Sequence, residues 1–167
     1  GNASSIAQIC RRLDGIPLAI ELAAAHVNML SLEQIAMRLD EKLTLLTKGN
    51  RTTLPRHQTI RASIDWSWNL LSKAEQTLLQ RLSVFMGGWG LAGAEAVNDN
   101  IPQTFDLLHN LVEKSLILFE RKDERYFMLE TVREYALERL RDADEEETTR
   151  DKHLGFYMEM AEQAEPK

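Results

Sequence analysis

Apolar residues recur at helical spacing over most of the chain, and short polar or glycine-containing segments separate one amphipathic stretch from the next. The first stretch places four apolar residues on one helical face: Ile6, Ile9, Cys10 and Leu13. Ser4 or Ser5 is expected to cap this helix, because a serine oxygen can accept a hydrogen bond from the first turn. The pattern predicts a mainly α-helical protein.

A sharp corner follows at the segment Asp14-Gly15-Ile16-Pro17. Gly15 is expected to end the first helix, because glycine readily adopts the left-handed conformation that closes helices. Pro17 suits the first turn of the next helix, where its missing N–H would have no helical partner. From Pro17 to about Met29 nearly every residue is apolar or alanine, which predicts a helix buried on most of its circumference.

The next helix begins with a capping box, in which Ser31 is followed three residues later by Gln34. Leu32, Ile35 and Leu39 are on its apolar face. Residues 47–57 then contain threonines, a glycine, an asparagine and a proline that interrupt every period. We expect a linker and a domain boundary there.

After a helix that carries Ile60, Ile64 and Trp68, the sequence predicts three helices and a hairpin, in the order of a winged helix-turn-helix. A second capping box, Ser72 with Glu75, opens the first of these three helices. A short helix over 92–97 and another over 104–114 follow the glycines at 87, 88 and 90. Residues 116–119 and 125–129 are β-prone, and a charged turn joins them.

A helix beginning near Thr131 and a last amphipathic helix complete the chain, with the acidic run 142–147 between them. We interpret that run mainly as a solvated connector. The predicted organisation is a helical subdomain over residues 1–57, a winged-helix subdomain over 58–141, and an acidic connector with the start of a C-terminal helical region over 142–167.

Composition and charge narrow the classes of partner. With 44% apolar and 28% charged residues, the chain has an ordinary globular mixture and should fold. Residues 1–57 hold seven Lys/Arg and five Asp/Glu, residues 58–141 ten and twelve, and residues 142–167 three and nine. No block is strongly basic, which argues against direct DNA binding. No apolar run approaches a membrane span and no signal peptide is evident, so a cytoplasmic protein is expected.

Candidate catalytic and metal-binding patterns are weak. Residues 88–93 match G-x-G-x-x-G, but a capped helix precedes them instead of a strand, so we favour a turn that Trp89 plugs. The chain contains no P-loop sequence, and the four histidines lack zinc spacing, so we interpret each as a partly exposed structural residue. Cys10, the one cysteine, is interpreted as core, and Trp66 and Trp68 as residues that pack a helix on its neighbours.

A family resemblance emerges from an ordered set of motifs. Gly15-Ile16-Pro17-Leu18, with the alanine-rich helix after it, resembles the GLPL or GxP element of the NB-ARC (AP-ATPase) group of STAND NTPases. Residues 54–67, 82–85, 111–116 and 128–136 resemble the winged-helix region of large bacterial regulators of that class. The resemblance covers nearly the whole chain, and the ordered set is more specific than any single motif.

The resemblance implies a role in nucleotide-gated signalling. In that group a P-loop domain, a helical subdomain and a winged helix close around ADP or ATP, and the nucleotide state controls a C-terminal sensor. By resemblance, Pro17 would lie against the adenine, with Gly15 and Leu18 beside it. The alternative interpretation of Gly-x-Pro is a plain corner between two helices. No catalytic or metal-binding residue is assigned, and a metal is not expected.

One departure from the family pattern concerns the second strand of the wing. Many members carry a histidine there, within a Leu-His-Asp or Met-His-Asp motif, that contacts the nucleotide phosphate. This chain has Met128-Leu129-Glu130, and the Leu129 side chain cannot donate a hydrogen bond. Leu129 is therefore not assigned as a ligand.

The expected function is the lid-and-switch portion of a STAND ATPase that regulates transcription. Its partners would be an upstream P-loop domain and a downstream helical-repeat sensor in the same polypeptide, with no membrane. This chain would not itself be an enzyme or hold ATP or ADP tightly, whereas the full-length protein would be an ATPase. The alternative is a winged-helix DNA-binding domain, which Asp106 and Glu113 on the expected recognition helix disfavour.

Overall fold

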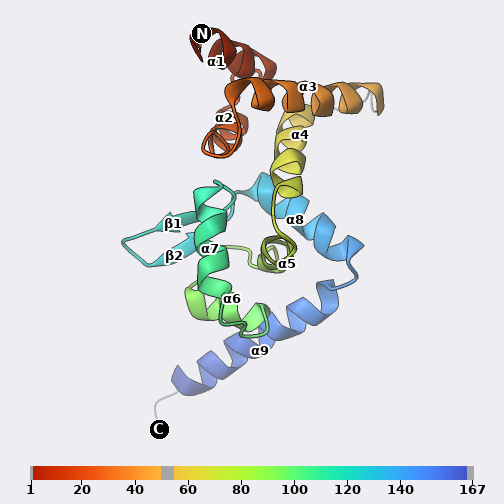
Figure 1. Ribbon diagram of the computed structural model, residues 1–167. Helices are drawn as coiled ribbons and strands as arrows, with labels where there is room; N and C mark the ends of the chain where they lie inside the picture. Colours follow the sequence, from red (N-terminus) through yellow and green to blue (C-terminus); the bar gives the residue numbers. More distant parts are fainter. Residues whose placement is uncertain (1, 50–54, 165–167) are drawn as a thin grey trace. The chain divides into compact units, whose positions relative to one another are not determined.

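The computed structural model describes residues 2–49 and 55–164 (Figure 1). Within these residues the chain is mainly helical, with nine helices and one small two-stranded sheet. It divides into two compact units, Gly1–Leu71 and Ser72–Lys167. The prediction of a mainly α fold is confirmed.

The first unit consists of four helices. They are α1 (Asn2–Arg12), α2 (Pro17–Ala24), α3 (Leu32–Gly49) and α4 (Pro55–Asn69). Helix α3 packs against α1 and α4, and α4 also packs against α2. The shared core includes Leu13 and Leu39, which are fully buried, and Trp66, which is 3% exposed. Trp66 and Trp68 are both buried, so their predicted packing role is confirmed.

Several predictions in the first unit need correction. Helix α1 already includes Asn2, so Ser4 and Ser5 lie inside the helix and do not cap it. Helix α2 ends at Ala24, because the following N–H groups of His26 and Val27 bond three residues back in tight turns. Only three residues of α2 are buried, Ala19, Leu22 and Ala23, so the expected burial around most of its circumference is wrong.

The predicted linker at 47–57 is largely helical where the structure describes it. Helix α3 continues to Gly49 and α4 begins at Pro55, whereas residues 50–54 lie outside the described residues. Proline suits a first helical turn, which explains how a residue that looked like a breaker begins α4. The capping box of α3 is confirmed: Ser31 N–H donates to Gln34 Oε1 at 3.0 Å, and Gln34 N–H donates to Ser31 Oγ at 3.2 Å.

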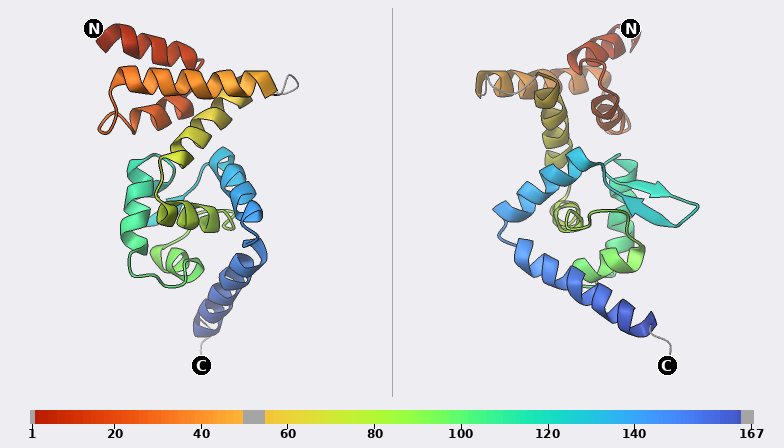
Figure 2. Two further views of the ribbon diagram at one scale, coloured as in Figure 1. Left: turned by 45° about the vertical axis from the view of Figure 1, so that its right-hand side comes forward. Right: turned by 180° about the vertical axis from the view of Figure 1, so that it is seen from behind.

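The second unit is a winged helix followed by one long helix (Figure 2). Its elements are α5 (Lys73–Leu82), α6 (Leu91–Val97), α7 (Thr104–Glu113), β1 (Leu118–Glu120), β2 (Arg125–Phe127), α8 (Glu130–Asp142) and α9 (Glu146–Ala164). Helix α5 packs against α7 and α8, and α9 packs against α6. The predicted capping box of Ser72 and Glu75 is present at the start of α5. The order of helices and hairpin confirms the winged helix-turn-helix.

The wing contains a third extended segment that the sequence did not predict. Strands β1 and β2 are antiparallel, with Phe119 opposite Tyr126. On the other side of β2, Trp89 N–H donates to Tyr126 O at 2.9 Å and Tyr126 N–H donates to Trp89 O at 2.8 Å. Trp89 is 1% exposed and stacks on Phe85, so its predicted burial is confirmed. A Cβ at Gly88 would lie 2.5 Å from a ring carbon of Phe127, so any larger residue there would force the Phe127 ring to move.

Candidate functional site

The corner between α1 and α2 is closed by two successive left-handed residues. Asp14 has φ 53° and Gly15 has φ 65°. Asp14 N–H donates to Arg11 O at 3.2 Å, and Gly15 N–H donates to Cys10 O at 3.0 Å, which is the hydrogen-bond pattern of a Schellman motif. Sequence reasoning gave Gly15 alone the role of ending the helix. Asp14 takes the first left-handed position because aspartate tolerates that conformation better than most residues.

Buried neighbours and one hydrogen bond fix the corner. Leu13 is fully buried and Ile16 is 4% exposed, so the core holds the chain just before and just after the two left-handed residues. Thr59, on α4, donates its hydroxyl hydrogen to Asp14 Oδ2 at 2.9 Å. This bond joins residues that are 45 positions apart, and no local motif could have predicted it. The corner is therefore held from three sides.

The outer surface of the corner is apolar and open. Pro17 starts α2 at its first turn and is exposed, whereas Leu18 is half-buried. A Cβ built on Gly15 would meet no atom within 4 Å, so the space beside the glycine is empty. The proline ring presents no N–H, hydroxyl or charge. The three predicted site residues, Gly15, Pro17 and Leu18, thus form one short surface that can contact a flat apolar group.

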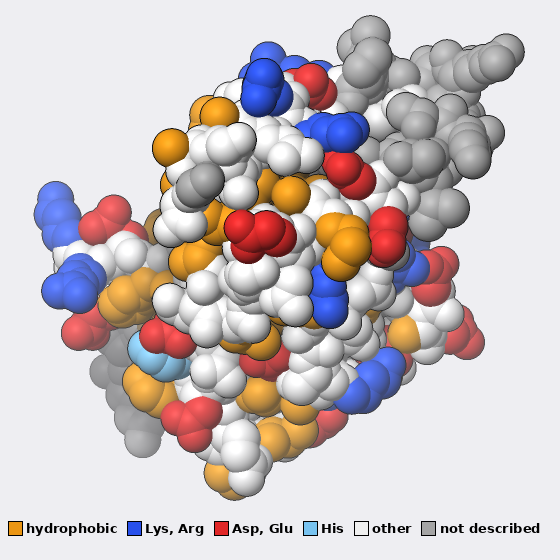
Figure 3. Space-filling model, turned by 45° about the horizontal axis from the view of Figure 1, so that its top comes forward, with side chains coloured by type: hydrophobic (Ala, Val, Ile, Leu, Met, Phe, Trp, Pro, Cys, Tyr) orange, Lys and Arg blue, Asp and Glu red, His pale blue; other side chains and the backbone are white. Residues whose placement is uncertain are grey.

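An apolar groove lies on the same side of α2 as Pro17. Ile20 and Ala24 follow Pro17 on one helical face, and both line the groove. Residues from α1 and α3 complete it, among them Ile9, Cys10 and Ile35, around a volume of about 230 Å³. Figure 3 shows apolar side chains at the surface among charged ones. Cys10 is half-buried at this groove, which corrects its assignment to the core interior.

One buried polar pair of the first unit, His26 with Ser67, was missed. His26 is fully buried, contrary to the expectation of a partly exposed residue. Its Nε2 lies 3.4 Å from Ser67 Oγ, and its ring meets the edge of Trp66 with centroids 4.7 Å apart. A histidine among small and apolar residues gives no sequence signal for such a partner.

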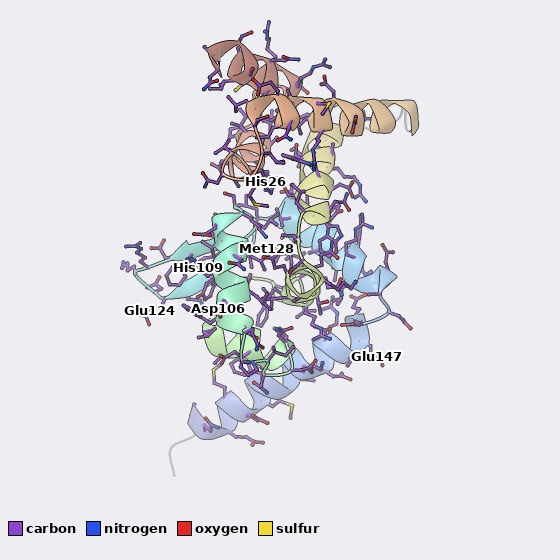
Figure 4. All side chains as sticks on the ribbon, in the orientation of Figure 1. His26, Asp106, His109, Glu124, Met128 and Glu147 are labelled. Carbon is purple, nitrogen blue, oxygen red and sulfur yellow. The ribbon has the colours of Figure 1, made fainter. Side chains whose placement is uncertain are left out.

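Helix α7, which has the position of the recognition helix in a winged helix, exposes acidic and neutral side chains. Asp106 and His109 are exposed on α7, and Glu124 lies at the turn of the wing (Figure 4). His109 Nε2 lies 3.5 Å from Glu113 Oε1. The one lysine at the end of α7, Lys114, is turned to Glu75, whose carboxylate oxygens both lie 2.8 Å from Lys114 Nζ.

The ion pair of Glu75 and Lys114 is nearly dry, because the two side chains are only 5% and 18% exposed. Burial raises the pKa of Glu75, but hydrogen bonds from Lys114 and from Ser72 outweigh burial and hold the pKa below its ordinary value. Lys114 therefore carries its charge into a protein contact, where a DNA phosphate cannot reach it.

Leu129 is the residue that takes the place of the NB-ARC histidine in the resemblance drawn from the sequence. Leu129 follows β2 and is the N-cap residue of α8, with a side chain that is 39% exposed and makes no capping hydrogen bond. An apolar side chain at this point neither binds phosphate nor titrates.

The described residues offer neither a metal site nor a membrane span. No three His, Cys, Asp or Glu side chains of the described part come together as ligands for a metal ion. Among the described helices, none combines the length and the apolar character that a membrane crossing requires.

Comparison with known proteins finds relatives that are much longer than this chain. No family model matches the chain, and no solved structure matches it. Proteins named "Putative HTH-type transcriptional regulator", from Mycobacterium bovis and Mycobacterium tuberculosis, are 47% identical over 166 residues, which is 96% of this chain but 19% of the relative. "Uncharacterized protein" relatives from the same two species are 41% identical over 150 residues, or 38% of their length. The chain thus spans about a fifth of the length of the named regulators it matches.

Proposed function

We propose that this chain is the lid-and-switch portion of a nucleotide-dependent STAND signalling ATPase that regulates transcription. One observation carries the proposal: the corner is rigidly held from inside while Pro17 is exposed and the space beside Gly15 is empty. The exposed ring and the open space beside it leave room for a group from outside this unit, as the resemblance to the NB-ARC group requires.

The proposed contact is with the adenine of ATP or ADP. Pro17 would supply the flat apolar face, Leu18 its flank, and Gly15 the clearance that a side chain would remove. The two states of the switch would be those with ATP and with ADP bound, which differ in the number of phosphates. The described residues contain no phosphate-binding loop, so an upstream P-loop domain of the same polypeptide would hold and hydrolyse the phosphates.

The winged helix would act as an intramolecular clamp, and a downstream helical-repeat sensor would follow it. The length of the mycobacterial relatives supports this arrangement, since about four fifths of the named regulators lie outside the matched segment. The sequestered Lys114 and the exposed acids of α7 also favour a protein contact over a nucleic acid contact.

A second candidate function is DNA binding by the winged helix itself. The fold and the names of the regulators favour it, because helix-turn-helix proteins place such a helix in the major groove. The charge of α7 argues against it: Asp106 and Glu113 are exposed, and the nearby lysine is bound to Glu75. We therefore rank it below the clamp.

The corner proposal predicts weaker nucleotide binding in the full-length protein when Pro17 is replaced by alanine. Alanine suits the first helical turn, so α2 should persist, but two ring carbons that would touch adenine are lost. At about 0.8 kcal/mol for each buried methylene, the dissociation constant for ADP should rise roughly tenfold. Titration calorimetry would measure it.

Pro102→Ala is the matched control, because Pro102 is also exposed but lies in the second unit, far along the chain from the corner. Its dissociation constant should equal that of the wild type. An unchanged affinity in Pro17→Ala would show that the corner is only structural and would end the adenine-wall proposal.

A further inference from the structure

The junction of α8 and α9 is a tight turn with a left-handed aspartate. Asp144 has φ 57°, its N–H donates to Arg141 O at 2.9 Å, and Glu145 N–H donates to Leu140 O at 3.2 Å. These bonds close α8 completely, and α9 begins two residues later at Glu146. The two helices are thus joined by a short segment in which a change of φ and ψ would redirect α9.

Helix α9 is docked by one face only. Among its described residues only Thr149 is buried, although α9 is one of the longest helices. His153 and Tyr157 contact Phe85 at ring-centroid distances of 4.7 and 6.4 Å. Leu154, Met158 and Met160 are each about half exposed. Few buried apolar contacts mean that local opening of α9 costs less than opening of the core.

Arg81 connects this junction to the body of the winged helix. It lies in the last turn of α5, and its side chain is 13% exposed. Arg81 Nε donates to Glu145 Oε2 at 2.9 Å, in the segment between α8 and α9. Arg81 Nη1 donates to Asp99 Oδ2, also at 2.9 Å, in the segment between α6 and α7. One guanidinium therefore ties together three parts of the unit.

Asp99 extends the connection to α9 itself. Lys152, on α9, lies 2.5 Å from Asp99 Oδ1. Hydrogen bonding from Lys152, helped by the charge of Arg81, keeps the pKa of Asp99 below its ordinary value despite some burial. Asp99 and Asn100 both have left-handed φ values, 58° and 53°, so the turn that presents the carboxylate is conformationally restricted. These ion pairs together connect α5, through the two connecting segments, to α9.

The exposed fractions of Arg81, Asp99 and Glu145 indicate that the ion pairs between them can break. The Glu145 and Asp99 side chains are 38% and 49% exposed, so both carboxylates can be hydrated when their partner leaves. Arg81 is the least exposed member and the one shared by both acids. Loss of the Arg81 contacts would thus free the start of α9 and leave neither carboxylate as a buried, unpaired charge.

We propose that Arg81 is the latch of a hinge at Asp144: while Arg81 holds Asp99 and Glu145, α9 stays docked, and when it lets go, α9 swings out while the winged helix remains folded. The hinge sets the direction in which the chain leaves the winged helix. This inference does not depend on nucleotide binding at the corner.

Hydrogen–deuterium exchange on the whole chain tests the latch with Arg81→Gln. Exchange of α9 amides should become about tenfold faster, because charged hydrogen bonds worth roughly 1.5 kcal/mol or more are lost, while α5, α7 and α8 keep their protection. In the wild type, about 1 M salt should accelerate α9 exchange in the same way by screening the ion pairs, and in Arg81→Gln it should have little further effect.

Arg141→Gln is the matched control. Arg141 also binds an acid at the junction, Glu146, at 2.7 Å, but the Arg141 side chain is 57% exposed and Glu146 keeps Arg150 as a second partner. Its α9 exchange should match the wild type. If amides exchange rapidly throughout the second unit of Arg81→Gln, the Asp99→Asn variant is measured as the deciding test of the latch. Faster exchange confined to α9 supports the latch, whereas wild-type exchange in α9, or loss of protection throughout the unit, overturns it.

Discussion

Left-handed residues that are not glycine close several helices of this protein, and each is a local compromise. Asp14, Asp99 and Asp144 are acceptable because a short polar side chain tolerates positive φ. Ser115, at φ 59°, occupies the same position after α7, where its N–H donates to Val112 O at 3.0 Å and Leu116 N–H donates to Leu111 O at 3.1 Å. Serine gains less from local hydrogen bonding there than aspartate does, so this turn carries conformational strain.

Replacing Ser115 with glycine should therefore stabilise the protein. Glycine adopts positive φ without a Cβ clash, and the gain should be about 1 kcal/mol in the free energy of unfolding, measured by urea denaturation. Ser115→Ala is the control, since it removes the hydroxyl but keeps the Cβ, and no gain is expected. Equal stability of the two variants would mean that Ser115 is not strained.

At the level of single residues, the sequence predicted those roles that depend on backbone chemistry. Pro17 begins a helix and Gly15 is left-handed, because proline and glycine have few alternatives. The partners of His26 and Asp14 could not be predicted, since each hydrogen bond joins residues more than 40 positions apart. Such pairs depend on how helices pack, which no local pattern encodes.

Capping and ion pairing meet where α5 begins. The ionised Glu75 carboxylate accepts a hydrogen bond from Ser72 N–H at 2.8 Å and another from Lys114 Nζ. One carboxylate therefore caps α5 and also fixes the end of α7. The capping box was readable from the spacing of Ser72 and Glu75, whereas the contact with Lys114 was not. Similarly, Ser31 correctly marked the start of α3, but its continuation to Gly49 went unrecognised because helix propensity favours ending earlier.

Replacing Glu75 with glutamine should make stability less dependent on pH. The folded state lowers the pKa of Glu75, so its stabilising effect is fully present above the pKa of an unfolded glutamate, about 4.3, and is lost as the pH falls below that value. At pH 7 the variant should lose roughly 1–3 kcal/mol of unfolding free energy. The difference in unfolding free energy between wild type and variant should become smaller as the pH falls below about 4.3.

Urea unfolding at several pH values would measure this gap. Glu113→Gln serves as the comparison, because Glu113 is 67% exposed and its ion-pair partner among the described residues is the similarly exposed His109. That variant should follow the wild type at neutral pH. A gap for Glu75→Gln that stays constant down to pH 3 would contradict the assigned role of the carboxylate.

On the scale of the whole molecule, charge is divided unevenly between the two units. Residues 72–167 hold twelve Lys/Arg and twenty Asp/Glu, whereas residues 1–71 hold eight and six. The unit that contains the winged helix is therefore strongly acidic, with a net charge of −8. The sequence correctly predicted this fold from the order of its elements, but it did not predict the third extended segment of the wing, because Trp89 makes a single pair with Tyr126.

The acidic winged helix should not bind duplex DNA in a salt-sensitive manner. Binding through several phosphates requires cations, and each neutralised phosphate would add to the salt dependence. We expect no shifted band in a gel-shift assay at low salt with duplexes of mixed sequence. A shifted band that disappears steeply as salt is added would favour the DNA-binding alternative.

The arrangement of the wing also bears on aggregation. Strand β2 is bordered by β1 on one side and by Trp89 on the other, so in the described wing the outer border of β1 is where another chain's backbone would add. Leu118 and Phe119 there are 43% and 41% exposed. Glu120 and the charged turn after it act as gatekeepers, because a carboxylate beside an open strand border discourages fibril-like stacking of one wing on the next.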